Sequence, residues 1–199
     1  MVPGDEILAV ALRTFATHGY EGVSLRTINR ELGASPNLIY QRFGTKDELW
    51  KAAVDYGFGG LVDYARSGFD PTIADPLEQL RLAVRRFVLY SADHPELLGL
   101  MSIEGRQNTE RLRYIYDTYI EPAFRPLIRL LDHLADEGTI RAIPHRTFFF
   151  LFAHGGASSF TLAPLATLFD PSEPSDSRAA ERQADLVATI IIEGLRLPR

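Results

Sequence analysis

The sequence contains no cysteine among its 199 residues, which excludes a disulfide framework and a thiolate metal site. The five histidines show no paired spacing, and there is no Glu-x-x-His motif of the kind that builds metal sites in helical bundles. A glycine-rich phosphate loop and a Gly-x-Ser-x-Gly elbow are absent as well. We therefore expect a protein that is not an enzyme and that holds neither a cofactor nor a metal ion.

Long apolar runs are also missing. The longest, such as residues 147–153, are far shorter than the roughly 20 residues that a membrane span requires. The first residues include Asp5 and Glu6 and lead directly into an amphipathic pattern, unlike a secretory signal. We therefore expect a cytoplasmic protein without a membrane partner.

Helical periodicity dominates what is present. Nearly every periodic segment repeats its apolar residues at helical spacing, and no alternating stretch is long enough for a pair of strands. With 46% hydrophobic residues, the chain has enough apolar surface to bury a core. We therefore predict an all-α fold, starting with a helix whose apolar stripe runs from Ile7 to Phe15 and which ends at Gly19.

Residues 24–46 predict two short helices joined by a tight turn. Ser24 is the expected N-cap of the first helix, and Gly33 supplies the positive φ that ends it. Ser35 and Pro36 are expected at the N-cap and the first position of the second helix. The apolar faces are formed by Leu25, Ile28 and Leu32 in the first helix and by Ile39 and Phe43 in the second. This arrangement is typical of a helix-turn-helix.

The other side of the second helix is polar and consists of Asn37, Tyr40, Gln41 and Arg42. Such side chains reach base edges and phosphates when their helix lies in a major groove. The net charge of the whole chain is −5, so its overall field does not attract DNA, but residues 24–46 hold four cationic side chains against Glu31 alone. Solvated surface charges are the alternative interpretation. The turn, the cap and both faces agree instead on double-stranded DNA as the partner.

The next helix opens with a capping box from Thr45 to Glu48 and is expected to end near residues 57–60 or somewhat later. It connects a first domain, residues 1–47, to a second one, residues 48–199. The helices expected in the second domain begin near residues 75, 95, 109, 144 and 178. Pro122 and Pro126 predict a kink or a break in the third of these, and the fourth is expected to continue toward Leu168.

Several short motifs stand in register at the N-terminus. They are Gly19-Tyr20 after the first helix, Ser24 at the start of the second, the Gly33-x-Ser35 turn, Ile39-Tyr40-x-x-Phe43, and Lys46-Asp47 at the start of the fourth helix. Together they resemble the DNA-binding domain of the tetracycline-repressor (TetR) family, over about a quarter of the chain. Leu38 departs from the pattern, because its place is often held by a small residue or threonine. It either touches a thymine methyl group or packs in the core.

The resemblance implies a homodimeric transcriptional regulator, usually a repressor, that binds an inverted-repeat operator. Residues 1–47 would be its helix-turn-helix domain, and residues 48–199 a helical domain for effector binding and dimerisation. The DNA-binding residues expected on this basis are Arg26, Thr27, Ser35, Pro36, Asn37, Leu38, Tyr40, Gln41, Arg42 and Lys46. The alternative is an all-helical ligand-binding or interaction protein that does not bind an operator.

Dimerisation is also favoured by the last two long apolar helices. The segment at residues 148–152 is apolar on nearly all sides, and the final helix offers a second apolar stripe. Two copies of each would bury these faces in a four-helix bundle, unless both helices bury them within one chain. The interface residues predicted are Phe149, Phe160, Leu186 and Ile190.

An effector pocket is expected in the middle of the second domain. Its predicted lining is Phe87, Tyr90, Met101, Tyr114, Tyr119, Phe124, Phe152 and His154. Large apolar walls with a few polar tips suit a small apolar or aromatic effector. Plain core packing is the alternative for each of these residues, because aromatic residues at helical spacing commonly fill a bundle.

Overall fold

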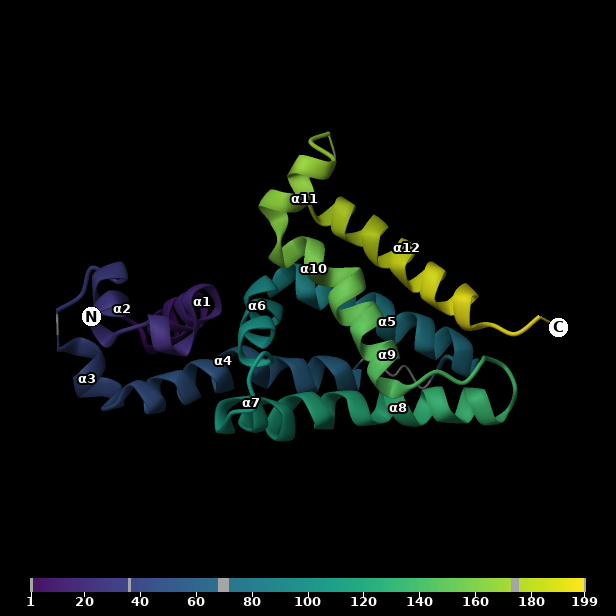
Figure 1. Cartoon of the computed structure of the whole chain (residues 1–199), viewed down its shortest axis with the longest axis horizontal. Coiled ribbons are helices and arrows are strands. Elements are labelled where there is room, and N and C mark those ends of the chain that lie inside the picture. The colour runs from purple at the N-terminus through teal and green to yellow at the C-terminus, as the bar shows by residue number, and fades with distance from the viewer. Residues whose placement is uncertain (1, 36, 68–71, 173–175, 199) are drawn as a thin grey trace.

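The computed structural model describes residues 2–35, 37–67, 72–172 and 176–198. Over these residues the fold is all-helical, as predicted, and contains no strand beyond an isolated bridge between Ile140 and Arg196. Figure 1 shows the short N-terminal helices at one end of the molecule and the C-terminal bundle at the other. The helix α4 (Lys46–Ser67) runs between them.

The N-terminal domain packs three helices around a buried apolar centre. These are α1 (Gly4–Gly22), α2 (Leu25–Glu31) and α3 (Leu38–Phe43). Gly19 has a φ of 70° and interrupts α1 where the sequence predicted its end, although helical residues continue to Gly22. The centre contains the predicted stripe of α1 and one residue from each of the other helices: Ile7, Leu12, Phe15, Ile28 and Ile39, all at most 2% exposed.

The turn between α2 and α3 differs in part from the prediction. Ser24 caps α2 through its hydroxyl group, and Gly33 has a φ of 58°, both as predicted. The second helix, however, begins at Leu38, so the prediction of Ser35 as its N-cap was wrong. Pro36, expected at its first position, lies outside the described residues.

Asn29 of α2 explains why α3 begins without a serine cap. Its side chain is 3% exposed, and its Oδ1 accepts the Ile39 N–H group at 3.4 Å. Its backbone carbonyl accepts the Ala34 N–H group at 2.9 Å. The first N–H groups of a helix have no partner within the helix, so a side chain from α2 serves as the acceptor in place of a local cap.

The predicted capping box of α4 is confirmed. The Thr45 N–H group donates to Glu48 Oε2 at 2.8 Å, and the Glu48 N–H group donates to Thr45 Oγ1 at 3.2 Å. The Thr45 hydroxyl group also donates to Glu48 Oε2, at 2.8 Å, and the two bonds that this oxygen accepts hold the pKa of the Glu48 carboxyl group below its ordinary value. The helix then continues past the glycines at residues 57–60 to Ser67, the longer of the two lengths expected.

Gly57 lies where α4 passes between α1 and α6 (Pro95–Glu104). A Cβ atom at this position would lie 2.4 Å from Cδ2 of Leu12 and 2.9 Å from Cδ2 of Leu97. Leu12 belongs to the DNA-binding domain and Leu97 to the C-terminal domain. The absence of a side chain therefore allows the two domains to pack closely on one helix.

The C-terminal domain is a bundle in which α12 packs along α5 and α8 packs on α4 and α5. Its first helices are α5 (Pro76–Asp93), α6 (Pro95–Glu104), α7 (Glu110–Ile115), a π-helical turn η1 (Tyr116–Ile120) and α8 (Glu121–Asp136). After these come α9 (His145–Phe150), a second π-helical turn η2 (Leu151–Gly155), α10 (Gly156–Thr161), α11 (Ala163–Phe169) and α12 (Ser177–Leu195).

Prolines disturb two of these helices. The turn η1 ends directly before Glu121-Pro122, and Pro126 then lies inside α8, so the expected irregularity is a widened turn rather than a break. A proline lacks an N–H group and clashes with the carbonyl one turn earlier, which a wider turn relieves. The helix expected to run toward residue 168 breaks at Leu162, two residues before Pro164.

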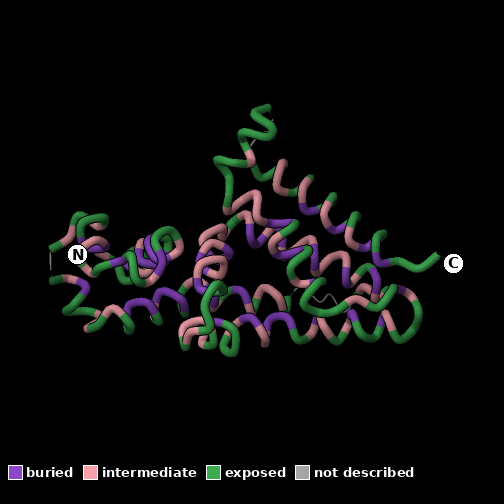
Figure 2. The backbone as a smooth tube through the Cα atoms, in the orientation of Figure 1, coloured by how far each residue is buried: buried purple, intermediate pink, exposed green. Residues whose placement is uncertain are grey.

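The helix α11 projects from the bundle, and Figure 2 shows it exposed along its length. None of its residues is buried. No single described helix is long and apolar enough to cross a membrane. The segments His145–Thr161 and Ala163–Phe169, bent by 87°, pass that test as a pair on length and composition alone.

Candidate DNA-binding surface and ligand cavity

The polar face predicted for the second helix is exposed on α3. Asn37, Tyr40, Gln41 and Arg42 all face solvent, whereas Ile39 is buried on the opposite side. On α2 and in the turn, Arg26 and Ser35 are exposed and Thr27 is partly exposed. Leu38 is partly buried against the core, which does not separate the two roles considered for it. Most predicted DNA-binding side chains are therefore accessible to solvent.

Lys46 belongs to a cluster that joins three helices. Its Nζ lies 4.1 Å from the centre of the Tyr20 ring, and the guanidinium carbon of Arg111 lies 4.0 Å from the same centre. The Tyr20 hydroxyl group donates to Asp47. Burial and this carboxylate raise the pKa of Tyr20 to about 12. The cation–π contacts thus connect the start of α4 with α1 and with α7 of the second domain.

Arg111 also neutralises a buried acid that the sequence analysis missed. Its Nε lies 3.3 Å from Glu104 Oε2, and the Glu104 side chain is only 4% exposed. The sequence gives no signal of this pair, because Glu104 ends an apolar helix and Arg111 lies beyond a loop. The fold brings the two together at the junction of the domains.

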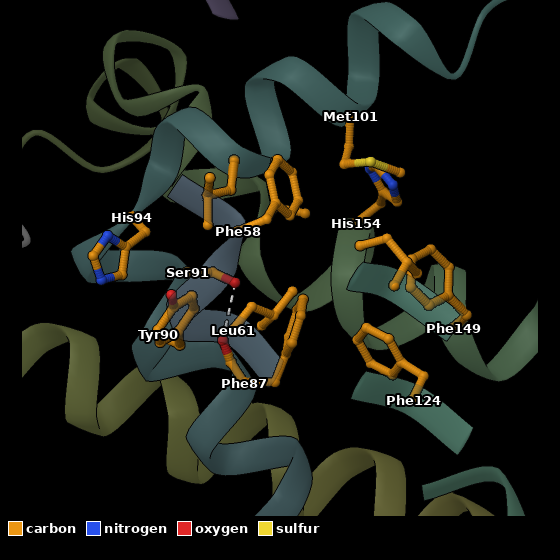
Figure 3. Close-up of a pocket in the computed structure, with 13 residues that line it drawn as sticks. Phe58, Leu61, Phe87, Tyr90, Ser91, His94, Met101, Phe124, Phe149 and His154 are labelled. Carbon is orange, nitrogen blue, oxygen red and sulfur yellow. Dashed lines mark hydrogen bonds between the residues drawn. The ribbon is translucent and has the colours of Figure 1, made fainter. Parts of the chain in front are cut away.

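A cavity of about 400 Å³, its opening included, lies within the C-terminal domain. Figure 3 shows Phe58 and Phe87 on one side of it and Phe124, Phe149 and His154 on the other. Five of the eight predicted pocket residues line it: Phe87, Tyr90, Met101, Phe124 and His154. The sequence analysis missed Phe58, Leu61, Ser91, His94, Leu97, Leu98 and Ile120, which also line it.

Three predicted pocket residues do not line this cavity. Phe152 is buried behind its wall, 4.8 Å between ring centres from Phe87. Tyr114 and Tyr119 instead donate hydrogen bonds to one oxygen of Asp55, at 2.5 and 2.7 Å. They are five residues apart, and the π-helical turn η1 brings that spacing onto one face, which sequence analysis with the α-helical period does not detect.

The cavity lining is weakly polar. Burial lowers the pKa of His154, which favours its neutral form. Burial and the nearby Glu96 carboxylate raise the pKa of Tyr90 to about 12, so its hydroxyl group stays protonated at neutral pH. His94 lies 3.7 Å from Glu96. The described lining contains no Asp, Glu, Lys or Arg, and no described group of three His, Asp or Glu side chains is placed to hold a metal ion.

The predicted dimer residues fall into two groups. Leu186 and Ile190 on α12 are 60% and 61% exposed in the single chain. Phe149 was predicted beside them, but it points inward, with its ring centre 5.2 Å from that of Phe124. Phe160 is partly buried against the core. Phe150, the last residue of α9, is 53% exposed instead.

Comparisons with known proteins agree with the helix-turn-helix. Residues 7–53 match the family of bacterial regulatory proteins of the tetR type. The transcriptional repressor SCO4008 of Streptomyces coelicolor is 34% identical over 51% of this chain and 48% of its own length. The repressor NicS of Pseudomonas putida is 26% identical over 51% of this chain and 47% of its own length. The chain thus matches about half the length of these curated relatives.

The complete fold is similar to that of a solved regulator. The structure of PfmR, a TetR family regulator of Thermus thermophilus, aligns with a TM-score of 0.67 and 21% identity over the whole of both chains. The whole chain therefore shares the fold of a TetR family regulator, and residues 7–53 match the tetR family of bacterial regulatory proteins. The all-α fold predicted from the sequence is confirmed, and the match at residues 7–53 agrees with the resemblance of the N-terminal motifs.

Proposed function

We propose that the protein is a cytoplasmic, homodimeric repressor that binds an inverted-repeat operator and leaves it when a small apolar molecule enters the cavity. Residues 1–47 supply the DNA-binding domain, and residues 48–199 the domain for effector binding and dimerisation. The observation that carries this proposal is the exposed polar face of α3, held by the buried Asn29 and Ile39 beneath it.

DNA recognition follows from the chemistry of this surface. Asn37 and Gln41 offer amide groups for base edges, and Arg26 approaches from α2. Lys46 contacts a phosphate from the start of α4. One short recognition helix gives limited affinity, so two copies are needed, spaced for successive major grooves roughly 34 Å or somewhat more apart.

Effector response follows from the position of the cavity. Both α4 and α6 line it, and both pack against α1 of the DNA-binding domain. A ligand that separates these helices would rotate the recognition helices away from the groove spacing. The effect is limited by the ratio of ligand affinities for the two conformations, typically about 1–3 kcal/mol, or roughly 5–150-fold in DNA affinity.

Fluorescence anisotropy with labelled DNA from upstream of the protein's own gene tests this function. We expect salt-dependent binding of one dimer per inverted repeat, and release by apolar or aromatic compounds that raise the melting temperature. Scrambled DNA of equal length is the control. Equal affinity for both DNAs would reject the repressor and favour a ligand-binding or interaction protein.

A further inference from the structure

A second cavity lies on the other side of one wall of the first. It measures about 430 Å³ with its opening and is bounded by α4, α5 and α8. Leu61, Phe87 and Phe124 line both cavities. The Phe87 and Phe124 rings meet edge to face, with their centres 5.6 Å apart. Rotation of one of these side chains would therefore join the two spaces.

The second cavity is lined mainly by apolar side chains. Small side chains, among them Ala65, Ala83 and Ala123, leave room along its walls. Arg86 is the one charged residue in its described lining. An apolar cavity with one guanidinium group in its lining suits a molecule with an apolar body and an anionic head group.

Among the described residues, no carboxylate compensates the charge of Arg86 as carboxylates compensate the charges of its neighbours. On the same helix, Arg81 pairs with Glu193 at 3.1 Å and Arg85 pairs with Asp185 at 2.6 Å. Arg86 donates instead to the backbone oxygen and the hydroxyl group of Ser67, at 2.8 and 3.1 Å. No carboxylate in the described part of the chain forms an ion pair with it.

The guanidinium group is also oriented by an aromatic ring. Its central carbon lies 5.0 Å from the centre of the Tyr64 ring, and Tyr64 lines the same cavity. The two bonds to Ser67 use two of the five N–H donors of the arginine, and no other described residue accepts from it, so within the described part of the chain three donors remain for a ligand. This arrangement places an oriented cation in the lining of the apolar space.

The first cavity, by contrast, disfavours an anion. His94 there lies 3.7 Å from the Glu96 carboxylate, and the same negative charge contributes to the raised pKa of Tyr90. Burial favours neutral His154. An anionic head is therefore attracted to Arg86, and the apolar body is left to occupy the first cavity.

We propose that the two cavities form one site for an apolar carboxylic acid, whose carboxylate binds Arg86 and whose apolar body passes between Phe87 and Phe124. This inference rests on the proposed function, because it names the chemical class of the effector. Each additional CH₂ group that reaches the first cavity strengthens binding roughly fourfold, until the space is filled.

Isothermal titration calorimetry without DNA tests the site. The probes are decanoate, decanol and decyltrimethylammonium at sub-micellar concentration, with phenylbutanoate to distinguish ring-bearing from straight-chain acids. We expect decanoate or phenylbutanoate to bind about tenfold or more tightly than decanol, and the ammonium compound to bind least. Equal affinity for decanoate and decanol, with no preference for phenylbutanoate, would overturn the proposal.

Variants then locate the head group. Arg86→Gln is expected to weaken binding of the preferred acid about tenfold or more and to leave decanol unchanged, whereas Arg86→Lys retains part of the preference. Arg66→Gln is the matched control, because this exposed arginine of α4 has 68% of its side chain accessible and does not line either cavity. Equal weakening by both glutamine variants would contradict the assignment to Arg86.

The experiments distinguish a failure of the proposed acid site from a failure of the proposed repressor function. Acid binding that depends on Arg86 but leaves operator affinity unchanged supports the site and rejects its regulatory role. If neutral apolar compounds release DNA but the acids do not bind, the carboxylic acid site is rejected and the repressor function is supported. Melting temperatures of all variants, measured without ligand, identify any loss of binding that is caused by unfolding.

Discussion

The guanidinium group of Arg111 stacks on the ring of Tyr20, with 4.0 Å between its central carbon and the ring centre. Arg111 belongs to the C-terminal domain, whereas Tyr20 follows the kink near the end of α1. Lys46, which we propose as a phosphate contact, lies over the same ring. The Tyr20 ring therefore connects the C-terminal domain directly to a residue of the proposed DNA-binding surface.

Arg111→Met should destabilise the protein by roughly 1.5–3 kcal/mol, because it leaves the Glu104 carboxylate buried without its partner. Urea unfolding followed by circular dichroism measures the change. Arg113→Met on the same helix, where the arginine is exposed and bonds Asn108, is the control and should change stability far less. Restoration of stability by adding Glu104→Gln to Arg111→Met would show that the pair is the cause.

Gly57→Ala and Gly59→Ala should act in opposite directions. A methyl group at Gly57 overlaps Leu12 and Leu97 and should cost about 1–3 kcal/mol, whereas no described atom lies within 4 Å of a Cβ at Gly59. Alanine at Gly59 should therefore stabilise α4 by about 0.5–1 kcal/mol. Thermal and urea unfolding test both. Stabilisation of similar size at both positions would contradict the close packing at Gly57.

The buried tyrosines should make stability fall at alkaline pH. Burial, and hydrogen bonds to carboxylates in two cases, raise the pKa of Tyr20, Tyr90 and Tyr114 to about 12, and the pKa of Tyr119 is raised as well. An unfolded tyrosine titrates near pH 10. The unfolded chain then loses protons that the folded chain retains, so the free energy of unfolding should decrease as pH rises from 10 to 12.

Ultraviolet absorbance of tyrosinate, recorded together with circular dichroism, measures this effect. The expected result is a group of tyrosines that ionise only as the helices unfold. Asp55→Asn should lower the pKa of Tyr114 and Tyr119, because it removes the negative charge beside both hydroxyl groups. Complete tyrosine ionisation near pH 10 in the folded protein would show that these hydroxyl groups are accessible to solvent.

Gln41→Ala and Lys46→Ala should weaken DNA binding in different ways. Loss of Gln41 should cost about 1–3 kcal/mol on the operator and relax the base preference. Loss of Lys46 should weaken binding to all sequences and reduce the salt dependence by about one unit per subunit. Anisotropy titrations over a range of salt concentrations separate the two. If Lys46→Ala leaves the salt dependence of binding unchanged, Lys46 does not contact a phosphate.

Ile190→Asp should convert the proposed dimer into monomer. The Ile190 side chain is 61% exposed in the single chain, so an aspartate at this position should not destabilise the monomer. In the dimer, the same aspartate would place a charge in a buried interface. Light scattering at micromolar concentration gives the mass. Tyr116→Asp, at a residue 52% exposed on η1, is the control and should remain dimeric. A monomeric wild-type protein would contradict the proposed dimer interface on α12.

The sequence predicted correctly those features that depend on interactions between neighbouring residues. Ser24, Gly33 and the pair Thr45 and Glu48 act through bonds and dihedral angles within a few residues, and each behaves as predicted. The predicted start of α3 failed because its acceptor comes from Asn29, ten residues before Ile39. Helical periodicity also did not predict that Tyr119 of η1 bonds Asp55, or that Phe149, shortly before η2, lines the cavity.

The sequence by itself determined the helical fold and the helix-turn-helix, because helical period, caps and turn glycines are properties of neighbouring residues. Only the tertiary structure decided which aromatic side chains surround a cavity and that Arg86 lines a second cavity. It also decided that Arg111 contacts both Glu104 and Tyr20. These relationships join residues from different helices. Their distances depend on how whole helices pack, and a helical repeat specifies a face without specifying which element will cover it.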